Sequence, residues 1–529
     1  MNTQISEPIF KALDESGKGA VTAKDIQSRL AQAGLSDDDP RLSALRDRLA
    51  DCGNDPAKII DAATFAEILQ AGQSLVERAM KEELVIPQFS VFAEHLRTLF
   101  DEVKSNRSGD LASYIPQLAR VEPEQFAVSV CTVDGQRLNL GDAGQLFSVQ
   151  SSCKPILYCG ALELCGGDYV HRHMGREPSG MSFNELSLNN AGLPHNPMIN
   201  AGGIMSASLW HPELPMADRF DRLAHLIATL SGGSRPGFDN AIFHSERDTA
   251  DRNFALAHYM REVGAFPRDT DIFKALELFF AACSVELTTE RLANIAATFA
   301  NGGICPPTGI RVFTDSTVKN CLSMMNSCGM YDYSGEFAFR VGMPAKSGVS
   351  GAIFAVVPNV LGIALWSPRI DSYGNSARGV AFLKRLVETF NFHNYDSLLD
   401  SQKLDPRARR QTIEANATFS AINAASRGDI SELKRLVAYG HSLDRADYDG
   451  RTPLHLASVE GHVGAVRFLL AQGVEKEPLD RWENTPLADA QQAGHERIVE
   501  LLARSKSVGT RGRSKGRKPK SEHRPRKAA

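Results

Sequence analysis

The 529-residue chain lacks the features that mark secreted and membrane-spanning proteins. Its nine cysteines are scattered without metal-ligand spacing, and their odd number favours reduced thiols over a disulfide framework. No run of about 18 uncharged apolar residues occurs, which predicts no membrane span. The first residues, MNTQISEPIFKALDESG, have neither a basic start nor an apolar core, and no arginine precedes Arg29. We therefore expect no secretory signal or transit peptide, and a cytoplasmic protein.

The composition is that of an ordinary globular protein, with 43% hydrophobic and 23% charged residues. A chain of this length exceeds a single core, so two to four domains are expected. The net charge of −4 is unevenly spread, because the tail 506–529 carries ten basic residues and one acidic residue. We predict that this tail is disordered. It serves either as a solubilising extension or as a contact for RNA, an acidic membrane surface or an acidic patch of the same chain, without sequence-specific nucleic-acid binding.

A repeat with a 33-residue period lies near the C-terminus. Thr452-Pro453-Leu454, within RTPLHLASVEGH, recurs as Thr485-Pro486-Leu487, and glycines keep the same step at 428, 461 and 494. The pattern resembles ankyrin repeats, in which Thr-Pro opens a first helix and glycine ends it. We predict about three repeats between 416 and 505, with Val466, Leu469 and Leu470 buried. Such a stack binds a protein partner or packs on its own enzyme.

The N-terminal segment LDESGKGAVTAKD resembles a calcium-binding loop of the EF-hand type. Asp14 would be position 1 and Asp25 position 12. However, Lys18 occupies position 5, where an oxygen ligand is needed, and position 12 is normally Glu. We predict an EF-hand-like all-α domain over 1–84 that does not bind calcium, with Leu30, Leu42, Leu45 and Leu49 on its helical faces. A more degraded second copy begins at Asp51.

The middle of the chain, 85–400, combines strand and helix patterns. EQFAVSVCTVDGQRLNLGD predicts a hairpin that turns at Asp134-Gly135, and GAIFAVVPNVLGIALWSP predicts another at Pro358-Asn359. Helical patterns such as RFDRLAHLIATLS and TERLANIAATFANGG lie between them. The expected fold class is α+β, an antiparallel sheet with helices.

The stretch QSSCKP presents three neighbouring candidate nucleophiles, Ser151, Ser152 and Cys153, before Lys154. On a helix, residues three apart share a face, whereas residues one or two apart do not. Lys154 therefore selects Ser151, because a buried lysine of lowered pKa can take the proton of a serine hydroxyl. We interpret Ser152 and Cys153 as packing residues.

A second motif strengthens this interpretation. Lys346-Ser347-Gly348, in PAKSGVSGA, resembles the K-[ST]-G strand that accompanies S-x-x-K in the serine β-lactamase and penicillin-binding superfamily. Tyr331 and Tyr333, in CGMYDYSGEFAF, lie between the two motifs as candidate acid–base groups. The order of motifs predicts a β-lactamase-like catalytic domain.

Six motifs in order resemble the serine-dependent glutaminases more narrowly: SYIPQLA, VQSSCKP, PHNPMINAGGI, SERDTADRNFALA, SCGMYDYSGEFAF and AKSGVSGA. The resemblance covers about 300 residues. EF-hand-like helices before it and ankyrin repeats after it are similar to the architecture of animal kidney-type and liver-type glutaminases. It implies hydrolysis of the side-chain amide of L-glutamine to L-glutamate and ammonia through a serine acyl-enzyme, with no metal or organic cofactor, in a homodimer or homotetramer.

The resemblance also implies roles for individual residues. The implied catalytic residues are Ser151 as nucleophile, Lys154 and Tyr331 as proton carriers, and Tyr114 near the leaving ammonia. The implied substrate-binding residues are Gln150, Ser151, Asn200, Glu246, Asn253, Phe279, Tyr331 and Val349. Backbone N–H groups of Ser151 and Val349 would form an oxyanion hole.

Two positions depart from the family pattern. Phe279 stands where these glutaminases have tyrosine, and Gly203 stands where they have alanine. The missing hydroxyl at Phe279 puts substrate affinity in question. Two alternatives remain at this point: a β-lactam or peptide hydrolase of the same superfamily, and an ankyrin-based scaffold without activity.

Overall fold

The computed structural model describes residues 10, 13–14, 21–51, 59–61, 64–66, 73–113, 115–180, 185–396, 403–408, 410–438 and 441–504. The chain divides into two compact units, residues 1–407 and 408–529. Tyr114, residues 15–20 of the candidate calcium loop, much of its second copy and the basic tail lie outside the described residues. The predicted domain boundaries 1–84, 85–400, 416–505 and 506–529 stay predictions.

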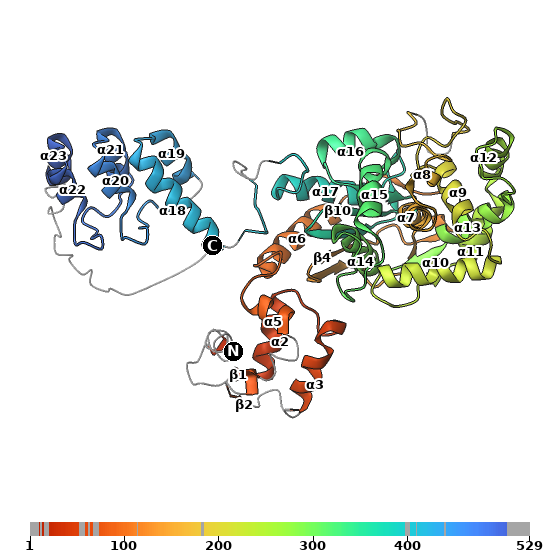
Figure 1. The fold of residues 1–529 in the computed structure, drawn as a ribbon, viewed down its shortest axis with the longest axis horizontal. Coiled ribbons are helices and arrows are strands. Elements are labelled where there is room, and N and C mark those ends of the chain that lie inside the picture. Colours follow the sequence, from red (N-terminus) through yellow and green to blue (C-terminus); the bar gives the residue numbers. More distant parts are fainter. Residues whose placement is uncertain are drawn as a thin grey trace, which may run out of the picture. The chain divides into compact units, whose positions relative to one another are not determined.

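A five-stranded antiparallel sheet of order β5-β4-β11-β10-β9 forms the centre of the first unit (Figure 1). Its strands are β4 (Ala127–Thr132), β5 (Arg137–Gly141), β9 (Ala345–Gly348), β10 (Ala352–Val357) and β11 (Leu361–Trp366). Both predicted hairpins are present, since β4 pairs with β5 and β10 pairs with β11. Positive φ angles at Gly135 and Asn359 make the two turns. The predicted α+β class is confirmed.

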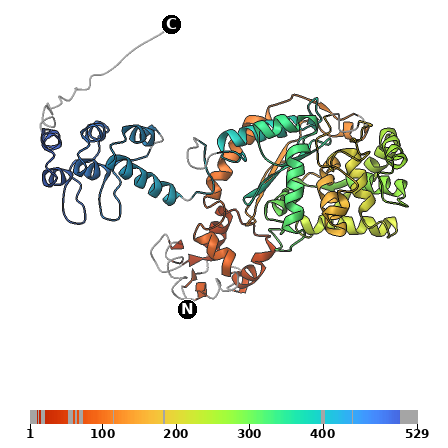
Figure 2. The same ribbon diagram turned by 45° about the horizontal axis from the view of Figure 1, so that its top comes forward.

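Helices cover both faces of this sheet, and Figure 2 gives a second view of these layers. Side chains alternate between the two sides along β10. Phe354 packs with the core that includes α14 (Thr289–Ala300), whereas Ile353 and Ala355 pack with α6 (Phe89–Lys104) and α17 (Ala377–Thr389). Every residue of β10 and β11 is buried for this reason.

A mainly helical lobe carries most of the predicted site. Its helices are α7 (Lys154–Cys165), α8 (Gly167–Val170), α9 (Asn200–Leu209), α10 (Met216–Leu230), α11 (Asn240–Asp248), α12 (Asp251–Glu262), α13 (Ile272–Cys283), α15 (Asp315–Cys328) and α16 (Ser334–Arg340). Short 3-10 helices are η1 (Pro40–Leu42), η2 (Leu118–Arg120), η3 (Gln150–Cys153) and η4 (Tyr331–Tyr333). Two small sheets, β6 (Phe147–Ser148)-β8 (Val285–Leu287)-β7 (Gly237–Phe238) and β12 (Arg369–Ile370)-β3 (Asp110–Leu111), complete the region.

The N-terminal part has the paired arrangement expected of EF-hand-like helices. Two short strands, β1 (Val21–Thr22) and β2 (Ile59–Ile60), pair antiparallel, one from each copy of the motif. Helices α2 (Ala23–Gln32), α3 (Ser43–Asp51) and α5 (Gln73–Met80) accompany them. The four leucines predicted for this core are buried. The Asp25 carboxylate accepts from the backbone N and hydroxyl of Thr22, at 2.8 and 2.7 Å, and so caps α2.

The second unit consists of helix pairs α18 (Arg410–Ser426) with α19 (Ile430–Ala438), α20 (Pro453–Val459) with α21 (Val463–Ala471), and α22 (Pro486–Gln492) with α23 (Glu496–Arg504) (Figure 1). Thr452 and Thr485 are the N-caps before the prolines, as predicted. Val466 and Leu469 are buried, but the prediction for Leu470 is wrong, because its side chain lies at the edge of the core and is only half-buried. No described helix in either unit has the length and apolarity that a bilayer span needs.

Candidate active site

Ser151 lies in a tight turn that leads directly into a buried helix. The turn is η3, and α7 begins at Lys154. Gln150 has φ of 47°, an unfavourable value for a residue with a side chain, and it redirects the backbone after β6. The Lys154 Nζ lies 2.6 Å from the Ser151 Oγ. The spacing of three residues therefore brings these two groups together as the sequence predicts.

The other two candidate nucleophiles point elsewhere. The buried Ser152 Oγ has no hydrogen-bond partner among the described residues. The Cys153 Sγ lies 3.9 Å from the Sγ of Cys283 on α13, in the protein core. Within the described residues the hydrogen bonds of the Lys154 Nζ go to Ser151 and Asn200, which agrees with a packing role for Ser152 and Cys153.

Lys154 is completely buried, and burial lowers the pKa of its ammonium group. The carboxylate of Glu246 opposes this shift. The Nζ also lies 2.9 Å from the Asn200 Oδ1. A lysine of lowered pKa, 2.6 Å from a serine hydroxyl, is suited to accept the serine proton.

Tyr331 and Lys346 complete the polar group beside Ser151. The Tyr331 hydroxyl donates to the Ser347 carbonyl at 3.0 Å, and Lys346 Nζ donates to the same oxygen at 2.7 Å. Burial raises the pKa of Tyr331, while a hydrogen bond with Ser151 opposes the rise. Lys346 lies 4.5 Å from the centre of the Tyr331 ring, and burial together with the charge of Lys154 holds its pKa well below the usual range. The sequence marked Lys346 through its K-S-G motif but assigned it no role.

A cavity of about 330 Å³ opens in front of Ser151. Six of the predicted site residues line it: Gln150, Ser151, Asn200, Glu246, Asn253 and Phe279. The Asn200 Nδ2 donates to the Asn253 Oδ1 at 3.0 Å, and Gln150 Nε2 donates to Glu246 Oε2 at 3.4 Å. Residues from η3, α9, α11, α12 and α13 therefore converge on one space.

Glu246 is the buried acidic group of this cavity, which the exposed Asp251 also lines. Burial raises its pKa to about 7, although Gln150 and the charge of Lys154 oppose the rise. An ionised carboxylate in this place attracts a cationic group, and the two asparagines offer amide groups to an anionic one. The cavity thus has complementary partners for both ends of an amino acid.

Val349 follows strand β9 on the other side of Ser151. A Cβ atom added to Gly348 would lie 2.6 Å from the Val149 carbonyl oxygen, so glycine permits the close approach of β9 to η3. Val349 is buried and lines a separate cavity of about 230 Å³ instead of the cavity in front of Ser151. The structure therefore does not place all ten predicted site residues around one space, and Tyr114 lies outside the described part.

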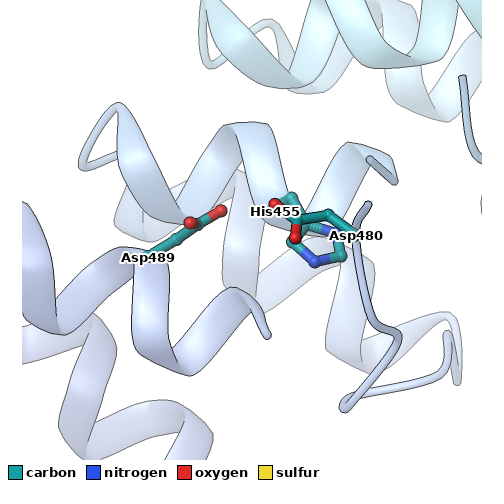
Figure 3. A group of neighbouring side chains, drawn as sticks. All are labelled: His455, Asp480 and Asp489. Carbon is teal, nitrogen blue, oxygen red and sulfur yellow. The ribbon is translucent and has the colours of Figure 1, made fainter. Parts of the chain in front are cut away.

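A candidate metal centre occurs in the second unit, but its histidine is already hydrogen-bonded through both ring nitrogens. His455, Asp480 and Asp489 lie close together and are the one such group in the described residues (Figure 3). Both ring nitrogens of His455 are engaged, Nδ1 with Thr452 and Nε2 with the Asn484 carbonyl. These contacts explain the group as a structural network.

Comparison with known proteins places this site in a family. The profile described as Glutaminase matches residues 109–395, with an EF-hand domain at 5–87 and ankyrin repeats (3 copies) at 421–511. The chain belongs to the glutaminase family. It is 42% identical to the mitochondrial liver isoform of glutaminase from Rattus norvegicus over 95% of this chain and 84% of the relative.

Bacterial glutaminases match a smaller share of the chain. A glutaminase from Nostoc is 42% identical over 57% of this chain and 90% of its own length. The solved structure of a probable glutaminase from Bacillus subtilis, complexed with 6-diazo-5-oxo-L-norleucine, is 33% identical with a TM-score of 0.53, covering 57% of this chain and 97% of the other. The predicted activity and architecture are confirmed: this chain is a glutaminase with an EF-hand domain and ankyrin repeats.

Proposed function

We propose that the glutaminase reaction proceeds through an acyl-enzyme on Ser151. The contact of 2.6 Å between the Lys154 Nζ and the Ser151 Oγ at the cavity carries this proposal. Lys154 accepts the Ser151 proton as the oxygen attacks the side-chain carbonyl of L-glutamine. Lys154 and Tyr331 then return a proton to the leaving nitrogen, the C–N bond breaks, and ammonia leaves. Water hydrolyses the ester to give glutamate, without a metal or organic cofactor.

The substrate is held by charges at its far end. The Glu246 carboxylate pairs with the α-ammonium group of glutamine, and the amide groups of Asn200 and Asn253 bind its α-carboxylate. Their positions around the cavity of about 330 Å³ support this arrangement. Gln150 orients Glu246 through their hydrogen bond of 3.4 Å.

The developing oxyanion is proposed to bind the backbone N–H groups of Ser151 and Val349. The close approach of β9 to η3 at Gly348 supports this pairing. Tyr114 stays a proposed neighbour of the leaving ammonia. Lys346 donates to the same Ser347 carbonyl oxygen as the Tyr331 hydroxyl, which supports a positioning role for Lys346 beside the phenol.

Covalent trapping tests the nucleophile. The glutamine-like electrophile 6-diazo-5-oxo-L-norleucine should add once to the protein, and fragmentation of the labelled peptide should place the adduct on Ser151. Ser152→Ala and Cys153→Ala should be labelled like the parent protein. An adduct on Cys153 would contradict the proposal.

Location and assembly are further proposals. A cytoplasmic location is supported by the eight cysteines of the described part, which are all free thiols. Cell fractionation tests it. A homodimer or homotetramer and a protein partner for the ankyrin repeats are proposed from the family resemblance, and sedimentation with and without residues 408–529 tests both.

A further inference from the structure

Cys283 ends α13 at the wall of the cavity in front of Ser151. Its side chain is 2% exposed, and it lines the cavity together with Phe279, which lies one turn earlier on the same face of the helix. Glu246 lines the same cavity from α11. The acyl-enzyme mechanism uses Glu246 and leaves the thiol of Cys283 without a role.

Neutral groups hold the buried carboxylate of Glu246. Within the described residues, the side chains that donate to it are Gln150, whose Nε2 lies 3.4 Å from Oε2, and Cys283, whose thiol donates to the carboxylate. Both donors oppose the rise in the pKa of Glu246 that burial causes. Because neither donor carries a charge, the negative charge of Glu246 stays available for a cationic partner.

Gln150 connects the same two residues a second time. Its Nε2 also lies 3.4 Å from the Cys283 carbonyl oxygen, so one amide group contacts both the carboxylate on α11 and the end of α13. Gln150 is itself fixed in the tight turn η3. The three elements η3, α11 and α13 therefore meet at the Glu246 carboxylate.

Cys153 determines the direction of the Cys283 thiol. The two Sγ atoms lie 3.9 Å apart, at the distance of a weak hydrogen bond between thiols. Each thiol has one proton, and that of Cys283 is donated to Glu246, so Cys153 is the donor in the contact between the sulfur atoms. The contact with Cys153 and burial raise the pKa of Cys283 well above its usual value. The Cys283 thiol therefore stays protonated and can serve as a donor.

We propose that Cys283 is a positioning residue for substrate binding, whose thiol donates a hydrogen bond to the Glu246 carboxylate and holds it toward the α-ammonium group of glutamine. This inference rests on the proposed role of Glu246 and adds a second residue to it. Cys153 acts one step further away, by orienting the thiol. Cys283 should therefore affect the binding of glutamine and the ionisation of Glu246, while the chemical step at Ser151 is unchanged.

The pH profile distinguishes this role from simple packing. Loss of the thiol donor leaves the effect of burial less opposed, raises the pKa of Glu246 and moves the acidic limb of the kcat/KM profile to higher pH. Other titratable and charged groups also face Glu246 or its cavity: Lys154 on α7, Cys153 on η3, and the exposed Asp251 and Arg252 on α12. These groups are the same in the parent protein and in the Cys283 variants, so a shift between their profiles reports the Glu246 carboxylate.

Steady-state kinetics of the full chain test the proposal with variants of the two cysteines. Cys283→Ala should raise KM for glutamine about 3- to 10-fold at pH 7 and keep kcat within about twofold, as expected when a weak donor to a charged group is lost. The deficit in kcat/KM should shrink as the pH rises, because Glu246 becomes ionised in both proteins. Cys283→Ser, whose hydroxyl also donates, should return KM and the acidic limb toward the parent values.

Cys153→Ala is the matched control. It removes a sulfur atom from the same contact but leaves the donor to Glu246 in place, so KM and the pH profile should stay near those of the parent. An equal rise of KM in Cys153→Ala and Cys283→Ala would overturn the proposal, because only the packing of the two sulfur atoms would then matter. Thermal unfolding shows whether the two alanine variants are equally well folded.

A double variant separates this inference from the proposed function. In the Glu246→Gln background, Cys283→Ala should cause no further rise in KM, since both residues act through one carboxylate. Additive effects would overturn the positioning role, as would an unshifted acidic limb in Cys283→Ala. An unchanged KM in Glu246→Gln alone would instead contradict the proposed role of Glu246.

Discussion

The two units each contain a buried group of polar side chains, and the two groups differ in how they are satisfied. In the ankyrin repeats, His455 uses both ring nitrogens, and the Asp489 carboxylate pairs with Arg451 at 2.6 Å. Burial alone would raise the pKa of Asp480. Hydrogen bonds from the backbone N–H groups of Asn484 and Trp482 outweigh this effect and hold the pKa below its usual value. These side chains bind one another and the backbone of neighbouring repeats.

The group around Ser151 is organised in the opposite way. Two lysines, Lys154 and Lys346, are completely buried and have lowered pKa values, and Glu246 has a raised one. The hydroxyls of Ser152 and Ser347 have no partner among the described residues. Such shifted groups cost stability and are typical of active sites. Buried groups with shifted pKa values and unpartnered hydroxyls thus indicate function more reliably than a cluster of His and Asp whose hydrogen bonds are satisfied.

The largest expected effect sharpens this contrast at the nucleophile. Ser151→Ala should lower kcat by at least about a thousandfold, because it removes the hydroxyl that lies 2.6 Å from the Lys154 Nζ. Ser152→Ala should keep most of the activity, since its Oγ makes no hydrogen bond in the described structure. The measurement is steady-state glutamate formation. A fully active Ser151→Ala protein would contradict the assignment.

The second largest effect is expected from removing the Glu246 carboxylate in the cavity in front of Ser151. Glu246→Gln should lower kcat/KM by about 10- to 150-fold, as expected when a hydrogen bond to a charged substrate group is lost. The loss should appear mainly as a raised KM for glutamine. Glu262→Gln, an exposed acid on α12, serves as the control. An unchanged KM in Glu246→Gln would show that another group binds the α-ammonium.

The pH dependence tests the same carboxylate in the parent protein. Because burial raises the pKa of Glu246 to about 7, the anion proposed to bind the substrate is lost as the pH falls below that value. Loss of this carboxylate alone should lower kcat/KM by about fivefold between pH 7 and pH 6, and further at lower pH. Protonation of Lys154 also lowers kcat/KM as the pH falls. The pH profile of Glu246→Gln should therefore show only the decrease caused by protonation of Lys154. A flat profile from pH 5 to pH 8 would rule out both groups.

The sequence predicted much of this site because its information is local. The spacing of Ser151 and Lys154 fixes their contact, since both lie in one turn that enters α7. The hairpins and the ankyrin period are local as well. The cavity of about 230 Å³ that Val349 lines could not be predicted, because Ser148, Asp239 and Ser350 are brought together only by the pairing of distant strands and the packing of α11. The half-burial of Leu470 likewise depends on the neighbouring helices.

The ankyrin group should respond through stability and not through catalysis. His455→Ala leaves the Thr452 N–H and the Asn484 carbonyl without their partner, at a cost of about 1–3 kcal/mol. The thermal transition of the second unit in the full chain should shift downward, while kcat is unchanged. Glu460→Gln, at an exposed position, should change neither. Stabilisation by added zinc that is lost in His455→Ala would show that the group binds metal after all.

The smallest effect concerns Phe279, which lines the cavity in front of Ser151 at the position where the family resemblance implies tyrosine. Its ring fits because residue 203 is glycine: a Cβ there would lie 2.6 Å from the Phe279 Cε2 and 3.1 Å from the Lys154 Cε. Phe279→Tyr should lower KM for glutamine by about 3- to 10-fold and leave kcat near its starting value, because the new hydroxyl binds the ground and transition states alike. Gly203→Ala, the reverse control, should lower activity by crowding the ring. Steady-state kinetics decide the matter, since an unchanged or raised KM in Phe279→Tyr would mean that the cavity has been rebuilt around phenylalanine and glycine together.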